Sequence, residues 1–162
     1  VDVLVSLAIM RFGVVKAIMP AVAAFVGSLL GGVVLYKWAQ VNPETVKELL
    51  LTVPGITEEL LRSTTHDMVG EATEALVLGG FTGVPFKLFA AIAFDAGLSP
   101  LSAFLEPAAI ARFARLLVVF AAFGLLRSLL YNKLRRVGLI RLTLFLWVLF
   151  YAWFGYVFWN IV

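Results

Sequence analysis

The sequence predicts an all-α fold: a polytopic helical bundle embedded in a membrane, with some helices broken or re-entrant. Three observations lead to this fold class. The 162 residues are 62% hydrophobic and 14% charged, with a mean hydropathy of +1.02, and a soluble domain of this size cannot bury so much apolar surface. The uncharged runs 17–36 and 142–162 each reach the length of about 20 residues that crosses a bilayer. Between them, repeated Gly and Pro residues interrupt the apolar stretch 79–107.

The composition also excludes several classes of function. The net charge is only +3 and the basic residues lie among apolar runs, so we expect no nucleic-acid-binding surface. The absence of Cys excludes disulfides, thiol catalysis and Cys-ligated metals, and a single His cannot build a His-rich site. No phosphate-binding Gly-rich loop, Ser-His-Asp set or convincing metal motif is present. We therefore expect neither an enzyme with catalytic residues nor a cofactor or metal.

Residues 1–16 are interpreted as the remnant of a first re-entrant hairpin. The apolar run within them covers only residues 3–10, half the length of a span, and it follows Asp2 instead of the basic residues of a signal peptide. We therefore expect a membrane protein whose start has been cut off.

Residues 17–37 are the first predicted transmembrane helix. Lys16 and Lys37 bracket its uncharged part, and such side chains can extend to the membrane surface. Gly27 and Gly31 are four apart and would let another helix approach closely. That helix can belong to this chain or to a second copy in a homo-oligomer.

Residues 39–79 have a different composition, with seven acids and two bases. Asn42-Pro43 is a typical helix start, and Pro54-Gly55 breaks the short helix that follows. A second helix is predicted to begin near Thr57. Its apolar residues recur at helical spacing among acids, so we expect amphipathic helices at the membrane interface or covering the bundle.

Residues 80–106 are predicted to form a second re-entrant hairpin, which turns near residues 96–100. Broken helices at membrane depth are tolerated only where their free backbone groups are buried in protein or line a watery cavity. In transporters such breaks usually mark the substrate site.

Residues 107–131 and 142–162 are the remaining predicted transmembrane helices, and the second contains nine aromatic residues. Between them lies a basic loop, 132–141. Together with Arg127 it carries five bases and no acid, so the positive-inside rule places residues 127–141 in the cytoplasm.

Three bases within apolar sequence are candidate ligands of an anionic head group. A charge near the bilayer centre costs about 2.5 to 3.5 kcal/mol on insertion scales, so such residues usually face a partner or a watery cavity. Arg112 and Arg115 are three apart and share one helix face, and Lys87 follows Pro85 where a half-helix would start. Cations beside a helix N-terminus suit a phosphate. The alternative is that these bases only form structural bridges to acids.

The acids Asp2, Asp95 and Glu106 are the candidate proton carriers. A carboxyl group in an apolar environment beside a cation can bind or release a proton as a substrate arrives or leaves. Glu106 directly precedes Pro107, so it can instead lie at an interface and cap the helix that follows.

The spacing of several blocks resembles the DedA (VTT-domain, SNARE-associated) membrane family, in particular its YqaA-like branch. The resemblance covers residues 1 to 125 and is carried by the following blocks: Phe81-Thr82-Gly83-Val84-Pro85-Phe86-Lys87, Pro100, Phe104, Ala111-Arg112-Phe113-Ala114-Arg115, Val1-Asp2-Val3-Leu4, and Gly27-Ser28 with Gly31 and Tyr36. The sequence departs from the family pattern at Gly83, Asp95 and Glu106, where the family usually has Pro, Gly and a small residue.

The resemblance implies two re-entrant hairpins that meet near the midplane of a bacterial or archaeal inner membrane. It implies that Lys87, Arg112 and Arg115 bind the substrate and that Asp2 exchanges the proton. The expected function is proton-coupled movement of an anionic lipid, polyprenyl phosphate or a phospholipid, between leaflets. Two alternatives remain open: an energy-independent lipid scramblase, and a membrane scaffold that transports nothing.

Overall fold

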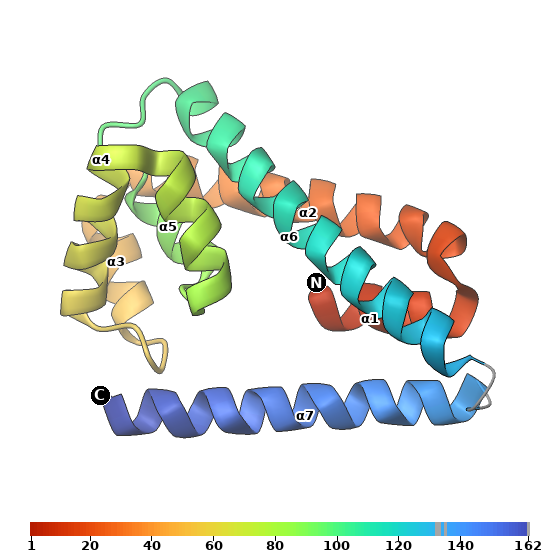
Figure 1. Ribbon diagram of the computed structural model, residues 1–162. Helices are drawn as coiled ribbons and strands as arrows, with labels where there is room; N and C mark the ends of the chain where they lie inside the picture. Colours follow the sequence, from red (N-terminus) through yellow and green to blue (C-terminus); the bar gives the residue numbers. More distant parts are fainter. Residues whose placement is uncertain (132–133, 135, 162) are drawn as a thin grey trace. The chain divides into compact units, whose positions relative to one another are not determined.

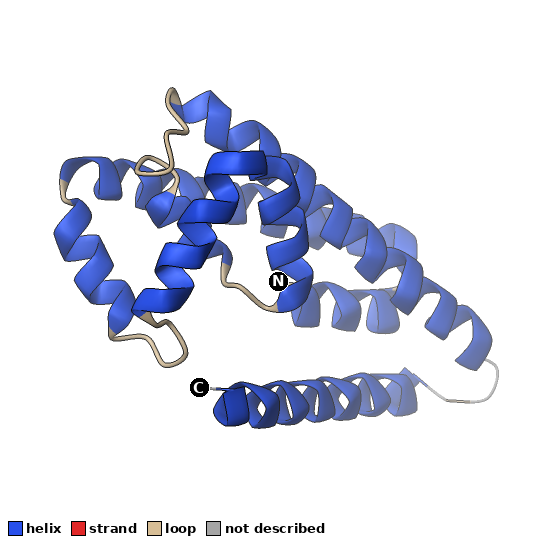
Figure 2. Cartoon of the chain, turned by 60° about the vertical axis from the view of Figure 1, so that its left-hand side comes forward, coloured by secondary structure: helices blue, strands red, loops and turns tan. Residues whose placement is uncertain are grey.

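The computed structural model describes residues 1–131, 134 and 136–161, and all regular secondary structure in these residues is helical (Figure 2). The all-α prediction is therefore confirmed. Contacts divide the chain into two compact units, Val1–Phe25 with Leu116–Val162, and Val26–Arg115. Two long helices, α2 (Val14–Val41) and α6 (Leu101–Leu130), contribute residues to both units (Figure 1).

The first unit packs α1 (Asp2–Phe12) against α7 (Arg136–Ile161). Its buried core consists of small and aliphatic side chains from α1, the start of α2 and the end of α6, among them Val5, Ile9 and Val119. A polar contact also joins α7 to α1, because the indole Nε1 of Trp147 donates a hydrogen bond of 2.8 Å to Ser6 Oγ. The apolar run that the sequence places before the first span is thus a helix that packs within the protein.

Arg127 holds the junction between α1 and α2 in the first unit. Gly13 separates the two helices with a φ of +94°, a conformation that favours glycine. The Arg127 guanidinium, from α6, donates hydrogen bonds to the carbonyl oxygens of Ile9, at 2.9 Å, and Met10. The Ile9 carbonyl also accepts from the Gly13 amide, at 2.9 Å, and a cation at the C-terminal end of a helix is favoured by the helix dipole. Arg127, which the sequence assigned to a basic segment, therefore closes the end of α1.

The second unit places three shorter helices beside the ends of α2 and α6. These are α3 (Pro43–Leu51), α4 (Glu58–Thr82) and α5 (Phe86–Ile92), and α5 packs against both α3 and α4. The predicted helix starts are confirmed: Pro43 is the first residue of α3, and Thr57 Oγ1 caps α4 by accepting from the Leu60 amide at 3.2 Å. The structure adds a kink in α4, where Glu71 has non-helical backbone angles.

The helix α6 begins at Leu101 and runs through Pro107, so residues 106 and 107, between which the sequence predicts a boundary, lie within one continuous helix. Proline in a helix interior removes one hydrogen bond and disfavours the helix. Here Phe104, Ala108 and Ala111 lie on one helical face and are all buried, and this packing stabilises a continuous helix across the proline. The predicted turn is confirmed, since residues 93–100 are non-helical or in turns between α5 and α6.

Among the described residues, two helices are long and apolar enough to cross a membrane, α2 and α6, and α7 contains a shorter apolar stretch, Val137–Trp153. Only 11% of the most apolar 18-residue window of α2, and likewise of α6, is buried. Large apolar side chains such as Met19, Val34 and Leu129 are exposed along them. A helix in the core of a soluble protein would bury such side chains, whereas a lipid environment accommodates them.

The basic loop predicted at 132–141 is described only in part. Lys133 and Arg135 lie outside the described residues, and α7 begins at Arg136. Arg141 is exposed on α7. The cytoplasmic placement of residues 127–141 stays a prediction.

The role of Arg127 predicts that Arg127→Gln destabilises the first unit. The variant loses charge-assisted hydrogen bonds to the last turn of α1, so we expect the free energy of unfolding in detergent micelles to fall by about 1 to 3 kcal/mol. Arg141→Gln is the matched control, because this exposed arginine on α7 should leave stability unchanged. Equal stability of the two variants would contradict the role.

The contact between α4 and α5 predicts that Gly79→Ala is destabilising. A Cβ at Gly79 would lie 2.3 Å from the Phe89 ring, so the ring must move, and such overpacking costs about 1 to 3 kcal/mol. Gly70→Ala on the same helix is the control, because its Cβ would meet nothing within 4 Å and alanine is the better helix former. Thermal unfolding of both variants in micelles checks the difference; a Gly79→Ala protein as stable as Gly70→Ala would show that the two helices do not pack as described.

Candidate functional site

The candidate site surrounds the break between α4 and α5 in the second unit. Gly83 ends α4 in the left-handed conformation, with φ +98°, and its amide donates to the Gly79 carbonyl at 3.1 Å. Pro85 is extended and directly precedes α5. The run Gly83-Val84-Pro85 therefore interrupts the helical path where the sequence predicts a break.

Arg115 binds the α4 side of this break. From α6, its guanidinium Nη1 donates a hydrogen bond to the carbonyl oxygen of Gly80, in the last turn of α4. Helical geometry leaves this carbonyl without a partner, and a cation at a helix C-terminus is favoured by the dipole. Arg115 is thus a structural partner of the break as well as a candidate ligand.

Arg112 approaches the α5 side of the break. Its guanidinium carbon lies 3.9 Å from the centroid of the Phe86 ring, a cation–π contact. Phe86 stacks on Phe104, with centroids 6.0 Å apart, and Phe104 stacks on Tyr36, at 5.7 Å. The Tyr36 hydroxyl donates to the Leu98 carbonyl at 2.8 Å. We call Tyr36, Phe104, Phe86 and Arg112 the aromatic column; it joins α2, α5 and α6 and fixes the guanidinium at the break.

Gly32 makes room for this column. A Cβ at Gly32 would lie 3.0 Å and 3.1 Å from two carbon atoms of the Phe86 ring and 3.5 Å from Phe104. The neighbouring Gly31 has no atom within 4 Å of the same position. Of these two adjacent glycines of α2, only Gly32 is therefore needed for packing within the chain.

Lys87 is exposed in the first turn of α5, one residue after the ring that Arg112 contacts. The sequence prediction combined this lysine with the N-terminus of a half-helix. Because α5 has only seven residues, any anion-binding capacity at this point rests on the charged side chains. The second unit thus brings Lys87, Arg112 and Arg115 to the two sides of one helix break.

Two of the three predicted proton carriers, Asp95 and Glu106, belong to the second unit. Asp95 is exposed in the turn after α5 and lines a cavity with residues of α3 and α4. Glu106 is exposed on α6 in a largely apolar groove that also contains Ser102. Asp2 is the first residue of α1 and belongs to the first unit. The role predicted for Asp2 therefore stays a prediction.

The described residues contain no group of three or more His, Asp or Glu side chains arranged to hold a metal ion.

The roles of Phe86, Phe104 and Tyr36 are the features that sequence reasoning missed. All three residues belong to the blocks that carry the resemblance to the DedA family, and this was the sequence signal for them; their stacking on one another was not predicted.

Comparisons of this chain with protein-family models, with curated proteins and with solved structures gave no match. The resemblance to the DedA family therefore stays a prediction from the motifs.

The aromatic column predicts a difference between two adjacent substitutions. Gly32→Ala pushes a methyl group against Phe86, which must shift by a few tenths of an ångström, so we expect an unfolding free energy about 1 to 3 kcal/mol below that of Gly31→Ala. Gly31→Ala should equal or exceed the wild type in stability, because it gains helix propensity without a steric cost. Chemical denaturation in micelles measures both variants, and identical stabilities would count against the column.

Proposed function

We propose that this protein is an integral membrane transporter of the DedA type, which moves an anionic lipid between leaflets. The observation that carries the proposal is the convergence of Arg112 and Arg115 on the break between α4 and α5, beside Lys87. The lipid would be a polyprenyl phosphate or an anionic phospholipid, and the shared ligand would be its phosphate group.

The membrane setting is supported by the long, exposed apolar helices. In such a setting a cationic side chain costs about 2.5 to 3.5 kcal/mol at the bilayer centre unless it has a partner or reaches water. Arg112 and Arg115 are partly buried on a helix that is long and apolar enough to span. A phosphate group that reaches the break would offset this cost.

Arg112 is the proposed principal ligand. A guanidinium presents several N–H donors in a planar fork that matches two phosphate oxygens, and stacking on Phe86 fixes the plane of that fork. Lys87 would add a mobile second charge from the first turn of α5. Arg115 would act mainly through the Gly80 carbonyl, keeping the break in shape.

The finer architecture belongs to this proposal. The end of α4, α5, the turn at residues 93–100 and the start of α6 would form the second re-entrant hairpin, and α1 would be part of the first. Residues 127–141 would face the cytoplasm of a bacterial or archaeal cell. Proton coupling would use Asp2, with Asp95 and Glu106 as further carriers.

One observation favours a second candidate, a scaffold that transports nothing. The hydrogen bond of Arg115 to the Gly80 carbonyl shows that a cation in this segment can have a purely structural role. In a scaffold, Arg112 and Lys87 would serve packing alone.

The two candidates predict different outcomes for Arg112. In vesicles reconstituted with the full chain, Arg112→Gln should lower phosphate-lipid flux about tenfold or more, because charge-assisted hydrogen bonds are lost. Arg112→Lys should recover only part of the flux, since lysine keeps the charge without the planar fork. The control Arg141→Gln should transport at the wild-type rate.

Unfolding curves separate transport from folding in this experiment. A folded Arg112→Gln protein with normal flux would overturn the proposal and favour the scaffold. Flux that depends on Arg112 but is unchanged by a pH gradient would refute proton coupling and indicate a scramblase.

A further inference from the structure

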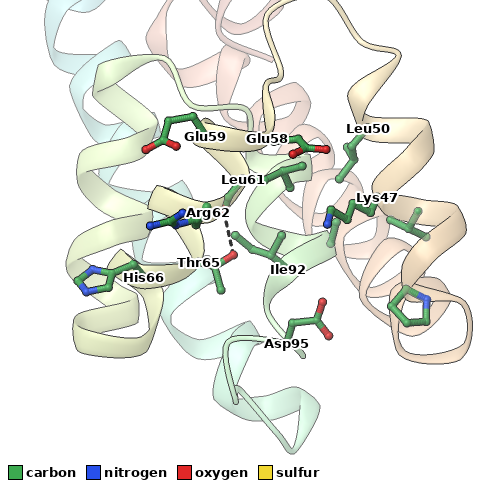
Figure 3. Close-up of a pocket in the computed structure, with 13 residues that line it drawn as sticks. Lys47, Leu50, Glu58, Glu59, Leu61, Arg62, Thr65, His66, Ile92 and Asp95 are labelled. Atoms are coloured by element: carbon green, nitrogen blue, oxygen red, sulfur yellow. Dashed lines mark hydrogen bonds between the residues drawn. The ribbon is translucent and has the colours of Figure 1, made fainter.

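A cavity of the second unit is lined by charged residues of α3, of α4 and of the turn after α5. This cavity of about 560 Å³ lies between α3, α4 and the end of α5, entirely within the second unit. In Figure 3, Lys47 extends from α3 into the space between Glu58, on α4, and Asp95, after α5. Lys87, Arg112 and Arg115 do not line this cavity.

The charged groups of this cavity do not neutralise one another directly. Within the part of the chain that the structure describes, no ion pair of 4.0 Å or less joins Lys47 to Glu58 or Asp95. The wall behind them is apolar and is formed by the buried side chains of Leu61 and Ile92. Charged groups that converge on an apolar wall leave room for a ligand with matching charges.

The sign of these charges selects the kind of ligand. A simple anion would meet Lys47 but would be repelled by Glu58 and Asp95, and a simple cation would be repelled by Lys47. A molecule with both charges can place an ammonium group between the carboxylates and an acidic group on the lysine. Arg62 and Glu59 also line the cavity and add one charge of each sign; the second cation suits the two charges of a phosphate better than the single charge of a carboxylate.

We propose that this cavity binds a compact zwitterion in which a short linker joins an ammonium group to a phosphate. Its volume lies within the range of about 300 to 1,000 Å³ that small-molecule sites occupy, which suits a free molecule or a head group. Two sources can supply this chemistry: a soluble phosphoamine, or a lipid head group that enters from the membrane surface. The site shares Asp95 with the proposed proton carriers but contains none of the proposed phosphate ligands Lys87, Arg112 and Arg115.

The probe for this site is O-phosphoethanolamine, titrated calorimetrically into the full chain in detergent micelles. We expect saturable binding, with inorganic phosphate and ethanolamine each at least about tenfold weaker, since each satisfies only one half of the site. Phosphate that binds as tightly as the zwitterion, or a probe that does not bind, would overturn the proposal. This ligand series needs no variant and therefore no assumption about folding.

Matched variants locate the binding. Lys47→Gln and Asp95→Asn should each weaken the affinity about tenfold, whereas Glu48→Gln, on the same helix as Lys47 but outside the cavity, should bind as the wild type does. Equal affinity of all three variants would overturn the assignment to this cavity.

Two further measurements separate the sources and the two proposals. The affinity for the soluble probe is compared in nanodiscs of phosphatidylethanolamine and of phosphatidylglycerol. If the lipid head group occupies the cavity, phosphatidylethanolamine should compete and lower the affinity for the probe. If the natural ligand is soluble, the affinity should be the same in both lipids. Arg112→Gln should keep full affinity for the probe. Flux measured in Arg112→Gln therefore tests the transport proposal, and probe binding measured in Lys47→Gln tests the cavity proposal. Either proposal can fail without the other.

Discussion

The structure depends on one constraint: helix ends within a very apolar chain leave carbonyl groups that need hydrogen-bond donors. Long polar side chains from distant segments supply them. Arg127 bonds to the last turn of α1, Arg115 to the last turn of α4, and the Tyr36 hydroxyl to the Leu98 carbonyl after α5. In each case a side chain of a long apolar helix, α2 or α6, donates to a carbonyl in the last turn of a shorter helix or in the turn that follows it. The breaks are therefore stabilised parts of the fold, and Arg127 and Arg115 stabilise them through hydrogen bonds to backbone carbonyls.

This constraint gives the predicted anion ligands Arg112 and Arg115 different roles. A sequence can show that a cation lies in an apolar stretch, but not whether a backbone carbonyl or a ligand is its partner. The carbonyl of Gly80 already accepts from Arg115, whereas Arg112 lies across the face of Phe86. An aromatic face restricts the orientation of a guanidinium that lies across it. We therefore propose Arg112 as the principal phosphate ligand and Arg115 as the residue that holds the break.

Local signals in the sequence predicted much of the helical pattern. Pro43, Thr57, Gly83 and Pro85 act through their own backbone or through residues a few positions away, so the helix starts and the break near them could be predicted. The start of α6 could not, because burial of Phe104 and Ala111 outweighs the cost of Pro107. Contacts between distant residues were also out of reach: Arg127 and Ile9 are 118 positions apart, and Arg115 and Gly80 are 35 apart. The cavity around Lys47 is lined by α3, α4 and α5. The spacing of apolar residues in the sequence does not predict how these three helices pack together.

The central claim is that the break between α4 and α5 presents Arg112 to an anionic head group. Side-chain nitrogen NMR of the full chain in micelles, with ¹⁵N-labelled arginine, tests it directly during titration with a short-chain polyprenyl phosphate. We expect a saturable shift of the Arg112 Nε–H resonance, a smaller shift for Arg115, and none for the exposed Arg141. An unchanged Arg112 resonance at saturating lipid, or equal shifts for all three arginines, would contradict it.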